Sequence, residues 1–174
     1  MTVPVWKKGL GLQKIDDVRI CHDFRWKKKH LESLKVAYAN APYFAEHLPF
    51  VEKMFSAAFE RLIDLNLEII RYILKQLQIR TELVLLSELG VEAKGADLPV
   101  EICRKMGSLH FAAQYPARRY LDPDLFSEAD IRLEFFRVPS PVYPQLWGDF
   151  IPDLSTFDLI FNCGPRAREI LIGT

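Results

Sequence analysis

The 174-residue chain lacks most of the features that usually identify a function from sequence. It has only three cysteines, Cys21, Cys103 and Cys163, which are too far apart for a CxxC pair or a zinc-binding spacing. We expect them to be reduced and mostly buried, like the free thiols of cytosolic proteins. The chain also lacks a net charge, because 23 Lys and Arg residues balance 23 Asp and Glu residues. This balance disfavours nucleic-acid binders and polybasic membrane binders, which both need an excess of cations.

The chain has no long hydrophobic run either. Charged residues interrupt every apolar stretch before it could span a bilayer. Trp6, Lys7 and Lys8 interrupt the start, where a signal peptide would be apolar. We therefore expect a cytoplasmic protein without a membrane span.

The common catalytic and metal-binding motifs are absent as well. Residues 9–14 begin like a dinucleotide-binding loop but lack its third glycine. Gly90 and Gly95 have the glycine spacing of a phosphate-binding loop, but the Lys and the Ser or Thr that should follow are missing. No metal-ligand spacing relates the four histidines, which are His22, His30, His47 and His110. We expect no metal and no cofactor.

What the sequence does have is the composition and periodicity of a globular α/β protein. Hydrophobic residues make up 49% of the chain and charged residues 26%, so a real core is expected. We predict a single domain over residues 1–174, with a mostly parallel sheet of about four to five strands, helices packed on it and a helical C-terminus. Strands are expected at residues 2–5, 18–22, 82–86, 109–112 and 131–136. Helices are expected at residues 25–38, 43–58, 59–78, 98–106 and 124–129, then from 156 and from 165.

The first predicted helix carries a histidine on its apolar side. Stepping 100° per residue from Trp26 places His30 inside the apolar arc of the helix. An imidazole in that position is either a core residue bonded to backbone or a general base or ligand facing a cleft. The lysines at 27–29 are read as a solvated face, with Lys27 as the exception.

The helix at 59–78 carries an amide on its apolar side. Asn66 falls near the centre of the predicted apolar stripe, and Asp64 falls on the opposite side. We predict that Asn66 is buried and hydrogen-bonded, either bracing a loop or pointing into a ligand site. Asp64 is predicted to be exposed, with Arg71 as a partner.

Five further polar residues of interest lie near the C-terminus. Ser155 and Asp158 have the spacing of a helix capping box, which explains both residues unless Asp158 serves a site. Asn162 stands where Gly164 and Pro165 predict a helix stop. The proline-rich loop at 139–152 follows a predicted strand, where ligands of α/β sheets bind. Its Tyr143 and Gln145 either contact a ligand or belong to a rigid loop over the core.

Taken in order, these positions resemble the WbqC-like protein family. The resemblance rests on residues 26–31, 37–38, 42–44, 62–66, 143–145 and 150–164. Members usually begin with a His-Gln-Pro-x-Tyr-Leu-Pro-Trp segment that is absent here, and residues 2–5 resemble an internal part of the family. We therefore expect a domain shortened at its N-terminus, with an exposed edge. Residues 110–113 also depart from the family's Tyr-Leu-x-Gly pattern.

The resemblance implies bacterial polysaccharide or O-antigen biosynthesis, or a related pathway, with acyl or aminoacyl transfer to an amino sugar or amine. In that hypothesis His30 is the general base and Asp158 orients it or a substrate hydroxyl. The substrate-binding residues would be Lys27, Asn66, Tyr143, Gln145 and Asn162. The alternative hypothesis is a non-catalytic binding or assembly partner. In either case the expected partners are a small sugar or amine, and a second copy or another protein that covers the exposed N-terminal edge.

Overall fold

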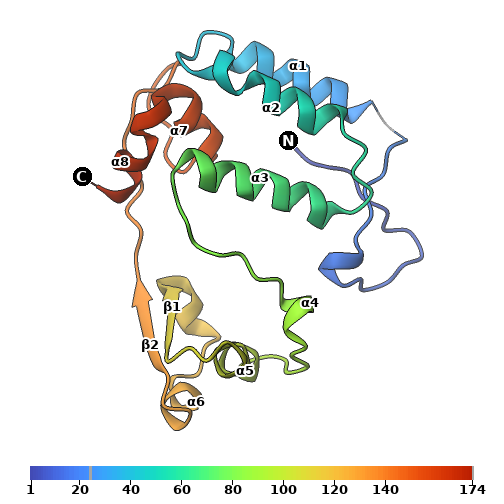
Figure 1. Cartoon of the computed structure of the whole chain (residues 1–174). Helices are drawn as coiled ribbons and strands as arrows, with labels where there is room; N and C mark the ends of the chain where they lie inside the picture. The colour runs from blue at the N-terminus through green and yellow to red at the C-terminus, as the bar shows by residue number, and fades with distance from the viewer. Residues whose placement is uncertain (24, 174) are drawn as a thin grey trace. The chain divides into compact units, whose positions relative to one another are not determined.

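The computed structural model describes residues 1–23 and 25–173, and the chain divides into two compact units (Figure 1). Unit 1 combines Met1–Thr81 with Ser140–Thr174, and unit 2 consists of Glu82–Pro139. The two units are described separately below. A single domain over residues 1–174 stays a prediction.

Unit 1 is helical. Its α-helices confirm the expected ones to within a few residues at each end. They are α1 (Trp26–Tyr38), α2 (Phe44–Ser56), α3 (Leu62–Gln76), α7 (Thr156–Cys163) and α8 (Ala167–Ile172), the last preceded by the short η3 (Gly164–Arg166). The short helix η1 (Ile15–Asp17) was not predicted.

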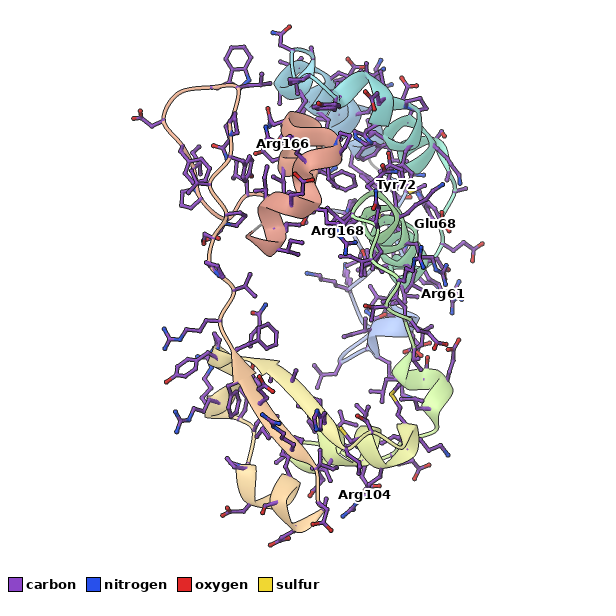
Figure 2. All side chains as sticks on the ribbon, turned by 60° about the vertical axis from the view of Figure 1, so that its left-hand side comes forward. Arg61, Glu68, Tyr72, Arg104, Arg166 and Arg168 are labelled. Atoms are coloured by element: carbon purple, nitrogen blue, oxygen red, sulfur yellow. The ribbon has the colours of Figure 1, made fainter. Side chains whose placement is uncertain are left out.

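Unit 1 has two hydrophobic clusters, one of which is built around α7. Five of the eight residues of this short helix are buried, as in a helix surrounded by protein, and its Ile160 and Phe161 are each 1% exposed. Phe44 and Val51 of α2 and Leu77 after α3 pack against them. Arg168 of α8 caps the C-terminal end of α3 (Figure 2). Its guanidinium donates to the carbonyls of Leu77 and Gln78 at 3.0 and 2.6 Å.

The two strands predicted near the N-terminus do not form. Val5 pairs with Ile20 and Arg19 pairs with Arg61, each through an isolated antiparallel bridge. A strand needs a continuous ladder of partners, and these short segments provide only single bridges. The predicted strand at residues 82–86 is also absent, since no ladder forms there and Leu86 begins a helix.

Unit 2 contains the sheet, which has two strands in the described part of the chain. β1 (His110–Gln114) and β2 (Arg132–Phe136) are parallel and pair in register, with His110 opposite Arg132. The expectation of four to five strands was therefore wrong, although the fold does combine helices with a parallel sheet. The other elements are α4 (Leu86–Leu89), α5 (Asp97–Met106), η2 (Tyr115–Arg119) and α6 (Pro123–Glu128).

Unit 2 has a small core of its own on one face of this sheet. Phe111 and Leu133, opposite one another on the two strands, pack with Cys103 of α5 and Phe126 of α6. Alternate residues point to opposite faces of a strand, so His110 and Gln114 lie on the other face and are exposed. No helix in the described part of the chain is both long enough and apolar enough to cross a membrane.

Replacing Gly164 with alanine should strongly destabilise unit 1. Gly164 has φ +51°, and an added Cβ would overlap the ring of Tyr43. We expect Gly164→Ala to lower the free energy of unfolding by about 2–4 kcal/mol, through backbone strain and steric overlap together. Urea denaturation followed by circular dichroism measures this loss.

Gly173→Ala is the matched control, because Gly173 has φ +73° but nothing within 4 Å of an added Cβ. It should cost about 1 kcal/mol, the conformational penalty alone. Equal losses in the two variants would contradict the close approach of Tyr43 to Gly164.

Candidate functional site

Unit 1 contains an apolar cavity of about 460 Å³ that is partly open to solvent, a size typical of small-molecule sites. Helices α1, α2, α3 and α7 and the first residues of the chain form its walls. Four polar side chains line it: His30, Ser33, Tyr38 and Ser155. The remaining lining residues are apolar or aromatic, which suits a hydrophobic ligand group with a polar end. They are Met1, Val3, Trp26, Leu34, Ala37, Phe50, Val51, Met54, Phe55, Leu65, Ile69, Phe157 and Phe161.

His30 lies in the cavity wall, which is one of the two placements left open by its position on the apolar side of α1. Its ring packs edge to face against Trp26 and Phe55, with centroids 5.5 and 6.2 Å away. The Trp26 ring is held by a hydrogen bond from its Nε1 to the Cys21 carbonyl at 3.0 Å. These contacts fix the imidazole by packing, and no hydrogen bond within the described residues engages its nitrogens.

The surroundings of His30 favour its neutral form. Desolvation by the apolar wall lowers the pKa of His30 below its ordinary value of 6.5. A neutral imidazole has one nitrogen that accepts a proton and one that donates a hydrogen bond. At neutral pH His30 therefore offers both functions to a molecule in the cavity.

Asp158 is the centre of a buried hydrogen-bond network beside this cavity. It is 5% exposed. Its Oδ1 accepts from the Tyr38 hydroxyl at 2.8 Å, and its Oδ2 accepts from the Tyr143 hydroxyl at 2.9 Å and from the Gln145 amide at 3.3 Å. Because Tyr38 also lines the cavity, the carboxylate helps to fix the side chain of a residue in the cavity wall.

Both tyrosines of the network remain protonated donors at neutral pH. Burial, together with the neighbouring Asp158, raises the pKa of Tyr143 to about 12 and that of Tyr38 further still. An ionised tyrosine would place a second negative charge beside the carboxylate. The network is therefore one acceptor group with three neutral donors.

Of Ser155 and Asp158, which together match a helix capping box, only Ser155 caps the helix. The Ser155 hydroxyl accepts from the Phe157 backbone amide at 3.3 Å and caps α7. The Asp158 side chain accepts from Tyr38, Tyr143 and Gln145, and makes no capping bond. Its role in the network therefore explains Asp158 better than the capping box does.

Gln145 also holds the loop that carries it. Its side-chain amide donates to the Ile151 carbonyl and accepts from the Ile151 backbone amide, both at 2.9 Å. Asn162 donates from Nδ2 to the Asp158 backbone carbonyl at 2.8 Å, one turn earlier in α7. Of the predicted residues, the structure thus brings Asp158, Tyr143, Gln145 and Asn162 together.

Lys27 and Asn66 lie elsewhere and do not line the cavity. Lys27 donates to the Ala57 carbonyl at 2.6 Å, at the C-terminal end of α2, where a cation is favourable. Asn66 is exposed, so the prediction that it is buried was wrong. The cause is the phase of the apolar stripe on α3, since Leu65 is the residue buried there. Substrate binding by Lys27 and Asn66 stays a prediction.

Asp64 has a different partner from the one predicted. It is half-buried and accepts two hydrogen bonds from Arg61, at 2.9 and 2.7 Å. Arg71 instead lies 4.0 Å from Glu68. Figure 2 shows Arg61, Glu68 and Tyr72 along α3.

Two polar residues, the half-buried Tyr38 and the buried His47, were not among the predicted site residues. Tyr38 shares the apolar arc of α1 with His30, so the same helical test would have found it. His47 lies on the buried side of α2 with Phe44, Val51 and Met54. It is 5% exposed, and its Nδ1 lies 2.6 Å from the Tyr72 hydroxyl. Burial lowers the pKa of His47, so it is a neutral core histidine.

Comparison with known proteins decides the family. The WbqC-like protein family matches residues 1–170. The chain belongs to this family. It is also 30% identical over 173 residues to the uncharacterized protein Rv1507c of Mycobacterium tuberculosis, and the match covers 98% of this chain and 74% of that protein. No solved structure matches the chain.

Family membership confirms the resemblance that the ordered motifs predicted, and nearly every residue of the site lies within the matched range. The described residues contain no group of three or more His, Cys, Asp or Glu side chains that could hold a metal ion. The arrangement that unit 1 offers is therefore an apolar cavity with a neutral histidine and a hydroxyl fixed by a buried carboxylate.

Removing the Asp158 carboxylate should destabilise unit 1. Asp158→Ala leaves the hydroxyls of Tyr38 and Tyr143 and the Gln145 amide without this acceptor. An unpaired buried polar group costs about 1–3 kcal/mol, so we expect a total loss of about 3 kcal/mol in the free energy of unfolding. The control is Asp149→Ala, at an exposed position in the same region of the chain, which should change stability by less than about 0.5 kcal/mol. Urea denaturation curves compare them, and similar values for the two variants would contradict a structural role for the network.

Proposed function

We propose that the chain is a group transferase of bacterial polysaccharide or related biosynthesis that moves an acyl group onto an amino sugar or another amine in the cytoplasm. The observation that carries the proposal is His30, a neutral imidazole in the wall of an apolar cavity whose ring nitrogens form no hydrogen bond within the described residues. The apolar lining favours the hydrocarbon part of an acyl donor over an aminoacyl group, whose charged amine would be desolvated there.

In the proposed reaction the amine or hydroxyl of the acceptor attacks the carbonyl carbon of the donor. A new C–N or C–O bond forms, and the bond between the carbonyl and the leaving group breaks. The neutral nitrogen of His30 takes the proton from the attacking group and returns it to the leaving group. No covalent enzyme intermediate is needed.

The Asp158 network would position the polar end of the ligand. The Tyr38 side chain lines the cavity and its hydroxyl donates to Asp158, while Tyr143 and Gln145 fix the carboxylate in turn. Asp158 is thus proposed as a positioning residue that acts through Tyr38. About 12 Å of helix separates Tyr38 from His30, eight residues apart on α1, so the network does not orient the imidazole itself.

A second candidate function is binding without chemistry. The observation that favours it is that none of the hydrogen bonds within the described residues joins His30 to a nucleophile or to an orienting carboxylate. The same cavity would then carry an apolar ligand for another protein. Activity and binding measurements on the same variants distinguish the two functions.

The transferase proposal predicts a base with a low pKa. With decanoyl-N-acetylcysteamine as donor and glucosamine as acceptor, the rate of amide formation per concentration of unprotonated glucosamine amine should rise with pH to a plateau, because only neutral His30 accepts a proton. The midpoint should lie below 6.5, since the pKa of His30 is lowered. His30→Gln should reduce the plateau rate about 10²–10⁴-fold, measured by mass spectrometry of the product.

His22→Gln is the matched control, because His22 is exposed and donates to the Phe59 carbonyl outside the cavity. Its rate should stay within about twofold of the unchanged protein. A His30→Gln variant as active as this control would contradict the role of His30.

The cavity itself is tested by filling it. Trp26 lines the cavity, so its fluorescence should change when decanoate binds. Ala37→Phe places a ring in the cavity and should weaken decanoate binding at least tenfold, whereas Val36→Phe, at a neighbouring position that is 79% exposed, should leave it unchanged. Saturable binding that Ala37→Phe abolishes, without any transfer to an acceptor, would favour the binding protein over the enzyme.

A further inference from the structure

Unit 2 gathers three arginines at one edge of its sheet. The parallel strands β1 and β2 end at the same edge (Figure 1). Tyr115 directly follows the last residue of β1, and Arg137 directly follows the last residue of β2. Arg118 and Arg119 come from η2, which begins at Tyr115. The carboxyl edge of parallel strands is where open α/β sheets bind ligands.

The arginines are arranged around two tyrosine rings. The Arg137 guanidinium carbon lies 4.0 Å from the centroid of the Tyr115 ring, and that of Arg118 lies 6.0 Å from the same centroid. The Arg119 guanidinium carbon lies 5.8 Å from the Tyr120 ring. Tyr115 thus holds two guanidinium groups near each other, although their like charges repel.

Among the residues that the structure describes, no acidic side chain forms an ion pair with this cluster. None of the ion pairs formed within the described residues includes Arg118, Arg119 or Arg137. The exposed carboxylate of β2, Glu134, lies 3.8 Å from Arg132 instead. Three cations therefore face solvent together in a chain whose formal net charge is zero.

We propose that this cluster, Tyr115, Arg118, Arg119 and Arg137, binds the diphosphate group of a small organic molecule. Guanidinium groups match phosphate oxygens with paired N–H donors, and stacking on an aromatic ring fixes the plane of the donor fork. Three arginines balance the two to three negative charges of a diphosphate, whereas one carboxylate would leave two of them without a counter-ion. Cation–π packing with Tyr115 and Tyr120 holds the three guanidinium groups but gives their charges no counter-ion among the described residues. The inference does not depend on the proposed transferase activity.

Calorimetric titration of the full chain with pyrophosphate tests the proposal. The unchanged protein should bind saturably, and raising the salt concentration should weaken binding. Arg118→Gln and Arg137→Gln should each reduce affinity about tenfold or more, because each removes charge-assisted hydrogen bonds. Arg137→Lys should recover only part of the affinity, since an ammonium keeps the charge without the fork.

Arg132→Gln is the matched control. Arg132 is an exposed arginine at the first residue of β2, whereas Arg137 follows the last residue of that strand. Its affinity should stay within about twofold of the unchanged protein, and thermal unfolding should show that all the variants fold. Titrations with uridine diphosphate and adenosine diphosphate then show whether the site recognises the diphosphate group alone or a nucleotide that carries it. Affinity equal to that of pyrophosphate supports recognition of the diphosphate alone, and tighter binding of one nucleotide supports a nucleotide ligand. Absence of saturable binding at millimolar concentration, or an equal loss in Arg132→Gln, overturns the proposal.

Discussion

The structure of unit 1 depends on a carboxylate that is 5% exposed. Burying an unpaired carboxylate costs several kcal/mol, so Asp158 is tolerated only with its donors in place. Those donors come from distant parts of the chain, since Tyr38 ends α1 and Tyr143 and Gln145 belong to the loop before α7. This single requirement fixes how α7 meets α1 and how the loop passes over the core. Gln145 transmits the constraint to Ile151 through two further hydrogen bonds.

Packing and polarity cooperate around the same helix. Phe161 of α7 meets Phe44 and Tyr38 edge to face, with centroids 5.0 Å apart in both pairs. Tyr38 therefore joins the aromatic core through its ring and the Asp158 network through its hydroxyl. Tyr38 and Phe161 also line the cavity. A ligand there would therefore contact a wall held by aromatic packing and by the Asp158 hydrogen bonds. This is the preorganisation that a binding or catalytic site requires.

Local sequence signals predicted much of this arrangement. The periodicity of residues 26–38 identified α1 and placed His30 on its inner side. The same method failed for Asn66, because the expected stripe gave weight to Ile63 and Ile70, while Leu65 is the buried residue and Ile70 is 41% exposed. Ser155 and Asp158 matched a local capping pattern, and only the approach of Tyr38, 120 residues away, reveals what Asp158 does. The prediction of the strands that are missing from the structure failed for a similar reason, since strand formation depends on partners distant in sequence.

Unit 1 is discontinuous in sequence, because unit 2 lies between Thr81 and Ser140. Chains leave the ribosome from the N-terminus, so α1, α2 and α3 emerge before the helix that fills their centre. Until α7 is synthesised, the part of their apolar surface that packs on α7 stays exposed and Tyr38 lacks its acceptor. Unit 2, which is continuous, can close its core earlier. A chain that ended after Pro139 would contain all of unit 2 but only part of unit 1. Its incomplete unit 1 would be a target for the chaperones and proteases of the cell.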